Sequence, residues 1–127
     1  ITQTKNLIPL ELRDKMGIRI YGCDTCQKVC PKNKGIKIPN HQEFIPTITK
    51  GYMDIEELLS ISNKQFKEKY GLMSGSWRGK NILKRNGIIA LGNIKREENI
   101  PLLKSLLDDS NPIIREYAQW AISKICN

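Results

Sequence analysis

The chain has 127 residues, of which 39% are hydrophobic, and a mean hydropathy of −0.43. This length suits one ordinary domain or a small module with a tail. No apolar run approaches the ~18 residues that a membrane-spanning helix needs, and we expect no signal peptide. The formal net charge is +8, which favours a polyanion partner such as RNA, although a codon bias toward Lys also explains it.

The first part of the chain predicts one short helix and then a loop. Residues 1–5 are expected to be extended, and a helix is expected over 6–17. Pro9 suits the first turn of that helix, and Gly17 is typical of its C-terminal end. Residues 31–51 contain repeated Pro and Gly with several Lys between them, which predicts a surface linker.

The second part predicts a series of helices. Apolar residues spaced by three and four indicate helices over 53–59, 62–70, 81–91, 101–107 and 112–126. Ser62 followed by Gln65 forms a capping-box pattern at the start of the second of these. Asn111 before Pro112 is a good start signal for the last.

A weak internal repeat links two of these helices. Lys84 to Gly92 aligns with Arg115 to Ser123 at an offset of 31 residues: a basic residue, a small one, and then an apolar–Ala–apolar–small run. This pattern suits helix pairs stacked as HEAT-like repeats, although two unrelated amphipathic helices would also produce it. We therefore expect a mostly α protein in which a short iron–sulfur segment precedes a helical, HEAT-like domain.

Three of the four cysteines lie close together and end on a proline. Cys23, Cys26, Cys30 and Pro31 match the last part of the ferredoxin run C-x2-C-x2-C-x3-C-P, in which the final Cys binds a different cluster from the others. Iron is bound through anionic thiolates, and a tight loop lets them converge. Two four-iron clusters need eight ligands, so further ligands must come from outside this chain.

Other readings of the cysteines stay open. Cys23, Cys26 and Cys30 with His41 would make a Cys3His zinc site. A redox-active pair at Cys23 and Cys26 is a further alternative, but no βαβ pattern accompanies it. Cys126 lies far from the cluster on a helix face with Ile122, and we expect it to be a buried core thiol.

At this cysteine stretch the chain resembles the C-terminal part of the epoxyqueuosine reductase family. The family pattern I-P-x-E-x-R-x-x-M-G-x-x-I-Y-G-C-D-x-C-Q-x-V-C-P is matched from Ile8 to Pro31. Its basic-Asn-x-x-x-A-L-G-N pattern is matched at Arg85-Asn86 and at 90–93. The linker over 32–76 is covered loosely, and the aromatic residue that the family places soon after the Cys-Pro is absent here.

The resemblance implies an enzyme with two 4Fe-4S clusters and cobalamin that reduces epoxyqueuosine to queuosine in tRNA. Cys23 and Cys26 would then bind one cluster and Cys30 the other, with Cys23 and Asp24 close to the corrin. The catalytic acid and most of the cobalamin pocket would belong to a missing N-terminal domain, so we assign no catalytic residue here. We expect the chain by itself to be inactive, and the full-length enzyme to be a cytoplasmic monomer.

A basic segment follows the linker and suggests where tRNA binds. Between residues 71 and 86 the chain carries no acidic residue, and Trp77 stands beside a Gly/Ser turn. An aromatic residue with cations around it suits phosphate contact and base stacking, although a solvated helix face with a core Trp would look the same. The predicted tRNA contacts are Lys5, Trp77, Arg78, Lys80, Lys84 and Arg85.

We therefore divide the chain into residues 1–51, the cluster-binding part with its linker, and 52–127, the helical tRNA-binding part. Two other functions stay open. One is a zinc-stapled helical module that binds RNA or protein without catalysis. The other is a ferredoxin-like electron carrier.

Overall fold

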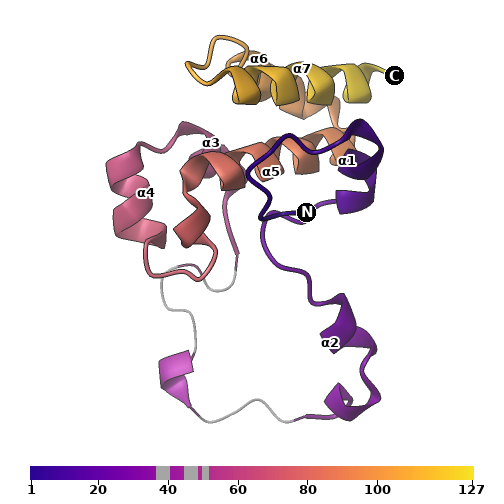
Figure 1. The fold of residues 1–127 in the computed structure, drawn as a ribbon, viewed down its shortest axis with the longest axis vertical. Coiled ribbons are helices and arrows are strands. Elements are labelled where there is room, and N and C mark those ends of the chain that lie inside the picture. Colours follow the sequence, from indigo (N-terminus) through magenta and orange to yellow (C-terminus); the bar gives the residue numbers. More distant parts are fainter. Residues whose placement is uncertain (37–40, 45–48, 50–51) are drawn as a thin grey trace.

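A computed structural model describes residues 1–36, 41–44, 49 and 52–127. Within these residues the protein is helical and contains no β-strand, as expected (Figure 1). Parts of the predicted linker, at 37–40, 45–48 and 50–51, lie outside the described residues.

The first helix is shorter than the sequence predicts. α1 spans Leu10–Met16, and Pro9 precedes it with an extended ψ of 144°. Residues before a proline avoid the helical region, so Ile8 stays extended. The amide of Ile8 instead donates to the Tyr117 hydroxyl at 2.6 Å, and its carbonyl accepts from Arg13 Nε at 3.0 Å.

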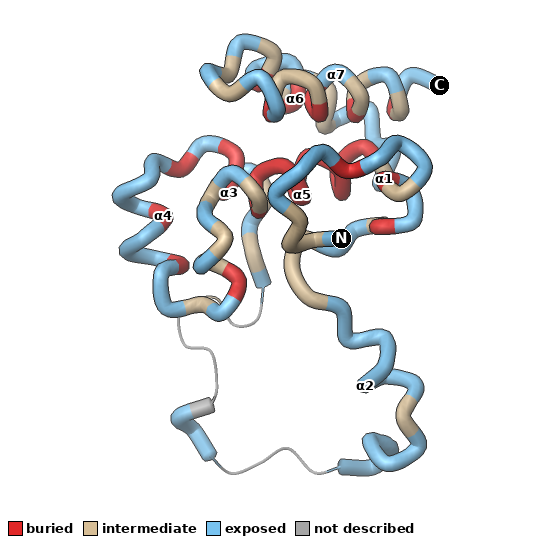
Figure 2. The backbone as a smooth tube through the Cα atoms, in the orientation of Figure 1, coloured by how far each residue is buried: buried red, intermediate tan, exposed pale blue. Residues whose placement is uncertain are grey.

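The cysteine segment contains a helix that the sequence did not reveal. α2 spans Thr25–Val29 and is followed by a 3-10 turn at Pro31–Asn33; a further turn spans Gln42–Phe44. Residues 22–36 are all exposed or half-buried, and α2 projects away from the rest of the fold (Figures 1 and 2). The asparagine of the 3-10 turn, Asn33, donates to the Gln27 carbonyl at 3.0 Å, so this segment is stabilised locally.

Two capped helices follow the linker. α3 spans Ile55–Ser60, and the Asp54 side chain accepts a hydrogen bond from the Glu57 amide. α4 spans Asn63–Tyr70 and begins with the predicted capping box between Ser62 and Gln65. Each cap satisfies amide groups that have no partner within the helix, which fixes where the helix begins.

The C-terminal half carries the longest helices. A 3-10 turn at Ser76–Arg78 leads into α5, Lys80–Ile94. A second turn at Glu97–Asn99 leads into α6, Ile100–Lys104, and α7 spans Pro112–Cys126 with Asn111 as its N-cap. The predicted bounds of α7 are confirmed, whereas α5 extends beyond the expected 81–91.

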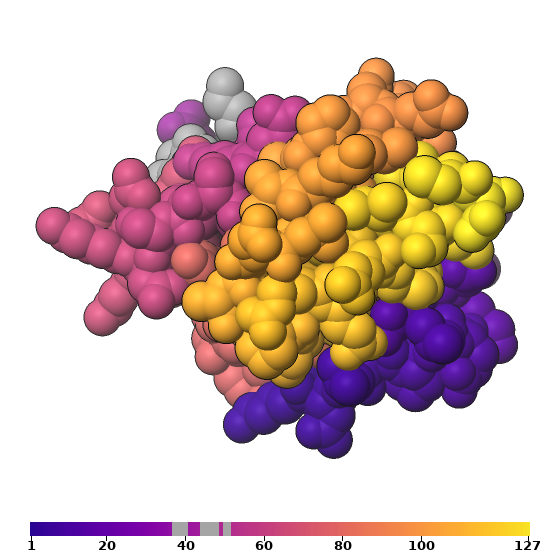
Figure 3. All heavy atoms as spheres, turned by 90° about the horizontal axis from the view of Figure 1, so that it is seen from above, coloured from indigo at the N-terminus to yellow at the C-terminus, as the bar shows by residue number. Residues whose placement is uncertain are grey.

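The main core lies between α5 and α7, and the N-terminal segment belongs to it. A Cβ added to Gly92 of α5 would lie 2.8 Å from the Trp120 ring and 3.1 Å from Ala121, so the two helices meet closely there. Ile8 and Met16 are buried in the same apolar cluster. Figure 3 shows the N-terminal segment lying along α7. The division at residue 51 stays a prediction, but the packing joins residues 1–16 to the helical part.

A second apolar cluster lies under α3 and α4. Leu58, Phe66, Tyr70 and Leu83 are buried in it, and Tyr21 packs against its edge. This cluster therefore brings the residue just before the cysteine segment into contact with the helical part.

Cys126 is exposed at the end of α7, which corrects the expectation of a buried core thiol. The buried stripe of α7 runs through Ala118 and Ala121 to Ile125, and Cys126 lies beside this stripe on the exposed side of the helix. Among the described residues, no helix is long and apolar enough to cross a membrane.

Candidate functional site

The three clustered cysteines are free thiols at the surface. Cys23 and Cys26 are exposed and Cys30 is half-buried. Cys26 lies in α2, and Cys23 and Cys30 lie just outside its two ends. Cys23 and Cys26 are therefore accessible at the surface, and Cys30 is partly accessible.

Cys23 has a polar surrounding that the sequence did not predict. Its Sγ lies 3.1 Å from Thr25 Oγ1, and Arg19 Nη2 donates to that same hydroxyl oxygen at 3.4 Å. Hydrogen bonds from the side chain and backbone of Thr25, and the nearby positive charge of Arg19, lower the pKa of the Cys23 thiol. The site favours the thiolate, the form that binds metal.

Two hollows flank Cys23. A hollow of about 480 Å³ lies between the first two residues of the chain, Met16 and Cys23. A smaller hollow of about 180 Å³ includes Asp24 and Lys28. Arg19 lines both hollows, with Lys15 in the larger one and Lys28 in the smaller one, so basic side chains border the space beside Cys23.

The described residues around the cysteines do not complete a metal site. Among the described residues, no group of three Cys, His, Asp or Glu side chains is placed to hold a metal ion. His41 lies in an exposed turn, where its Nδ1 is 2.9 Å from Glu43 Oε1. The donor chemistry of three clustered thiols fits iron–sulfur binding.

The 76–80 segment lies close to the start of the cysteine segment. A Cβ added to Gly75 would lie 2.7 Å from the Tyr21 ring, so Tyr21 packs directly on the Gly/Ser turn. Trp77 is 63% exposed, and the Arg78 guanidinium lies 3.8 Å from the centre of its ring. The Trp77 ring is exposed whereas Arg78 is half-buried, and Trp77 and Lys80 line a hollow of about 370 Å³.

The other predicted tRNA contacts differ in accessibility. Lys5 is exposed near the N-terminus. Lys80 is half-buried and donates through Nζ to the Ile61 carbonyl at 2.8 Å, and its partial burial lowers its pKa.

Lys84 and Arg85 are held inside the protein, which corrects their selection as surface cations. Lys84 Nζ lies 2.7 Å from Asp109 Oδ2, and Arg85 is only 1% exposed. The Arg85 guanidinium donates to the carbonyls of Thr4 and Asn6 at 2.9 and 3.1 Å. These carbonyls lie about eighty positions before Arg85 in the sequence and occupy its guanidinium donors. The buried guanidinium is therefore not available to a phosphate.

Sequence reasoning also missed two buried or half-buried asparagines of α5. Asn86 donates to the carbonyls of Thr2 and Ile20, both at 2.7 Å. Asn93 donates to the carbonyls of Arg13 and Gly17, both at 2.9 Å. Both belong to the Asn-x-x-x-A-L-G-N pattern, so the motif was visible but its structural role was not.

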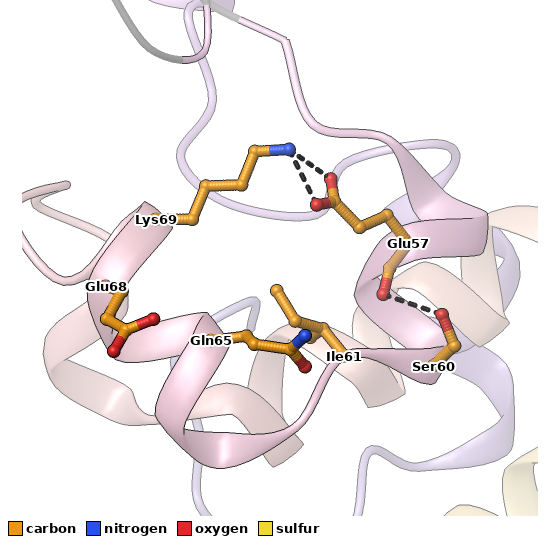
Figure 4. Close-up of a pocket in the computed structure, with 6 residues that line it drawn as sticks. All are labelled: Glu57, Ser60, Ile61, Gln65, Glu68 and Lys69. Atoms are coloured by element: carbon orange, nitrogen blue, oxygen red, sulfur yellow. Dashed lines mark hydrogen bonds and ion pairs between the residues drawn. The ribbon is translucent and has the colours of Figure 1, made fainter.

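A further hollow lies away from the cysteines and from the 76–80 segment. It measures about 630 Å³ and lies between α3 and α4 (Figure 4). Lys69 Nζ contacts both carboxylate oxygens of Glu57 at 2.6 Å across it. The hydrogen bond from Lys69, and then that from Tyr70, lowers the Glu57 pKa. No cysteine or residue of the 76–80 segment lines this hollow, so we assign it no role in the site.

Comparison with known proteins supports the reading of the cysteines. Residues 1–33 match the family described as a 4Fe-4S double cluster binding domain. The chain is 54% identical over 126 residues to an epoxyqueuosine reductase of Bacillus cereus, and 49% identical to that of Bacillus subtilis. Each match covers 98% of this chain.

Solved structures agree with the fold. A crystal structure of epoxyqueuosine reductase with a tRNA-Tyr epoxyqueuosine-modified stem loop has a TM-score of 0.91 and 49% identity over 99% of this chain. The selenomethionine-labelled enzyme has a TM-score of 0.90 at 50% identity. The chain spans 33% of the length of the Bacillus relatives and 34% of the chain in the stem-loop complex.

Proposed function

We propose that this chain, which is similar in sequence and fold to epoxyqueuosine reductases, serves as the C-terminal part of such an enzyme. In that enzyme it would supply cluster ligands and tRNA contacts for the reduction of epoxyqueuosine to queuosine. The observation that carries the proposal is the joint agreement of cysteines and fold: three accessible thiols lie within a segment that matches a double-cluster domain, on a chain whose whole fold matches the enzyme.

Cys23 and Cys26 would bind one 4Fe-4S cluster and Cys30 the other. When bound, the clusters would supply electrons one at a time for the reduction. The free, accessible state of the three thiols supports this assignment, as does the lowered pKa of Cys23. Cys23 and Asp24 would also lie near cobalamin, and both line the smaller hollow beside α2.

Trp77 and Arg78 would make the main tRNA contact, with Lys80 and Lys5 beside them. Their support is exposure and charge: the Trp77 ring is accessible, and Arg78 stacks on it. A ring with a guanidinium above it suits stacking with a base and pairing with a phosphate. Residues 1–51 would thus serve the clusters and 52–127, as a HEAT-like domain, the tRNA. We place the enzyme in the cytoplasm as a monomer.

Metal analysis of the full-length protein tests the enzyme assignment. Anaerobically purified protein should contain iron and acid-labile sulfide, together with cobalamin, and should convert epoxyqueuosine in tRNA. Zinc without sulfide would instead indicate the zinc-stapled module. Iron and sulfide without cobalamin or reductase activity would indicate an electron carrier.

Charge reversal tests the tRNA contact. Arg78→Glu in the full-length enzyme should raise the Kd for tRNA and lower the salt dependence of binding by about one phosphate contact. Lys104→Glu is the matched control, because Lys104 is an exposed cation on α6 away from Trp77. Equal tRNA affinity in the two variants would disprove the contact.

A further inference from the structure

Asn86 connects two distant parts of the N-terminal segment from inside the fold. Its side chain is fully buried, and its amide nitrogen donates to the carbonyls of Thr2 and Ile20, both at 2.7 Å. Its amide oxygen accepts from Arg85 Nε at 3.1 Å and from Arg85 Nη2 at 3.0 Å. Both ends of this buried amide are therefore hydrogen-bonded, which makes its orientation specific.

One of these two bonds ends immediately before the cysteine segment. Ile20 precedes Cys23 by three residues, and its carbonyl is held by Asn86. The next residue, Tyr21, is held from another side, because its ring packs directly on Gly75. The chain thus leaves the helical part at a point that two independent contacts define.

Beyond that point the cysteine segment has only local support. Residues 22–36 are exposed or half-buried. The hydrogen bonds recorded for Cys23, Thr25 and Asn33 reach partners no more than six positions away in the sequence. The direction in which Cys23 and Cys26 face therefore depends on the positions of Ile20 and Tyr21, together with the exposed hydrogen bond from Arg19 to Thr25.

We infer that Asn86 is a positioning residue for the thiolate pair Cys23 and Cys26. It acts through the Ile20 carbonyl and never touches a cluster. Because the ligands of a cluster must converge within a short distance, fixing their point of departure from the fold lowers the cost of ordering them. The inference rests on the proposed function, since it assumes that these thiolates bind a cluster.

The isosteric change Asn86→Asp isolates this role. The carboxylate still accepts both hydrogen bonds from Arg85, but it cannot donate to Thr2 and Ile20. Asn93→Asp is a matched control, because Asn93 also donates to two carbonyls of the N-terminal segment. Those carbonyls belong to Arg13 and Gly17, around α1 and upstream of the cysteine approach.

The first measurement needs no cofactor and uses the 127-residue chain. Amide hydrogen exchange in residues 20–26 should become at least about tenfold faster in Asn86→Asp. In Asn93→Asp the increase should be confined to residues around α1. Unchanged exchange at 20–26 in Asn86→Asp, or an equal increase there in both variants, would overturn the inference.

The second measurement uses the full-length enzyme loaded with clusters. Asn86→Asp should change the electron paramagnetic resonance spectrum and the midpoint potential of the cluster bound by Cys23 and Cys26. It should lower kcat for the tRNA substrate while leaving KM close to the unmodified value, and Asn93→Asp should leave spectrum and potential unchanged. Identical spectra and potentials in all three proteins would refute the positioning role.

A second variant covers the case in which Asn86→Asp does not fold. Gly75→Ala would place a methyl group 2.7 Å from the Tyr21 ring and displace Tyr21 without altering α5. The same spectral change is expected, and its absence would contradict the inference. If the unmodified full-length protein held no iron, the proposed function would fail, and the ligand-positioning role with it. Exchange at 20–26 that does not respond to Asn86→Asp refutes the inference alone.

Discussion

Residues 1–20 and residues 22–36 are neighbours in the sequence but differ in how the fold holds them. The first stretch is tied to α5 and α7 by buried side chains, among them Arg13, Arg85 and Asn86 (Figure 2). The second is exposed or half-buried and stabilised by local bonds. The buried polar contacts of the fold therefore hold the residues that lead to the cysteines. The cysteines themselves lie at the surface, where they are accessible to a ligand.

Removal of Arg85 should have the largest effect on stability. Arg85→Ala leaves a cavity and deprives the carbonyls of Thr4 and Asn6 of their donor, so it should lower the free energy of unfolding by about 4 kcal/mol. Urea denaturation of the chain measures this. The control is Arg96→Ala, whose exposed ion pair with Glu98 should contribute less than about 0.5 kcal/mol. Equal losses would show that the anchored stretch is not tied as described.

Asp109→Asn should cause the next largest loss of stability, because it leaves the buried Lys84 ammonium without its ion-pair partner. We expect a loss of about 3 kcal/mol at neutral pH. The neighbouring residue Asp108 is exposed and provides the control. Asp108→Asn should change the free energy of unfolding little.

The contribution of this pair should also depend on pH. Burial opposes ionisation of Asp109, but the hydrogen bonds from Lys84 and from the Asn111 amide outweigh it and lower the pKa of Asp109. A lowered folded-state pKa stabilises the protein above the ordinary carboxyl pKa, and this stabilisation disappears as the pH falls through the lowered value. The difference in free energy of unfolding between the unmodified protein and Asp109→Asn should therefore disappear at acidic pH. A gap that is constant with pH would argue against the ion pair.

Two glycines of α5 should respond in opposite directions to the same change. Gly92→Ala places a methyl group 2.8 Å from the Trp120 ring and should destabilise the fold by about 2 kcal/mol. Gly87→Ala meets Ile55 and Leu58 at an ordinary 3.6 Å, and should stabilise the helix by about 0.5 kcal/mol. Thermal unfolding distinguishes them, and the same sign for both would mean that α5 and α7 are not so closely packed.

The smallest effect on stability is expected in the cysteine segment. Cys26→Ser should change the unfolding free energy of the chain by less than about 0.5 kcal/mol, because Cys26 is exposed. The same change should lower the iron content of the full-length protein. Cys126→Ser, at another exposed cysteine, should leave the iron content unchanged. A large stability loss in Cys26→Ser would remove the contrast between the two stretches.

Local signals predicted the helix boundaries that depend on local chemistry. The capping box at Ser62 and Gln65 and the N-cap at Asn111 both occur where the sequence placed them. α2 was missed because five residues are too few to show a helical period. The first helix was predicted too long because the Ile8 amide has a distant partner, the Tyr117 hydroxyl.

The sequence by itself predicted the helical class, which the structure confirms, and it showed the cluster of three cysteines, because spacing along the chain carries that information. Only the tertiary structure decided which cations face solvent. Arg78 and Arg85 look alike in the sequence, yet one stacks on an exposed ring and the other is buried among carbonyls of residues 4 and 6. The reason is physical: a buried guanidinium needs acceptors, and here the acceptors come from a segment about eighty residues away.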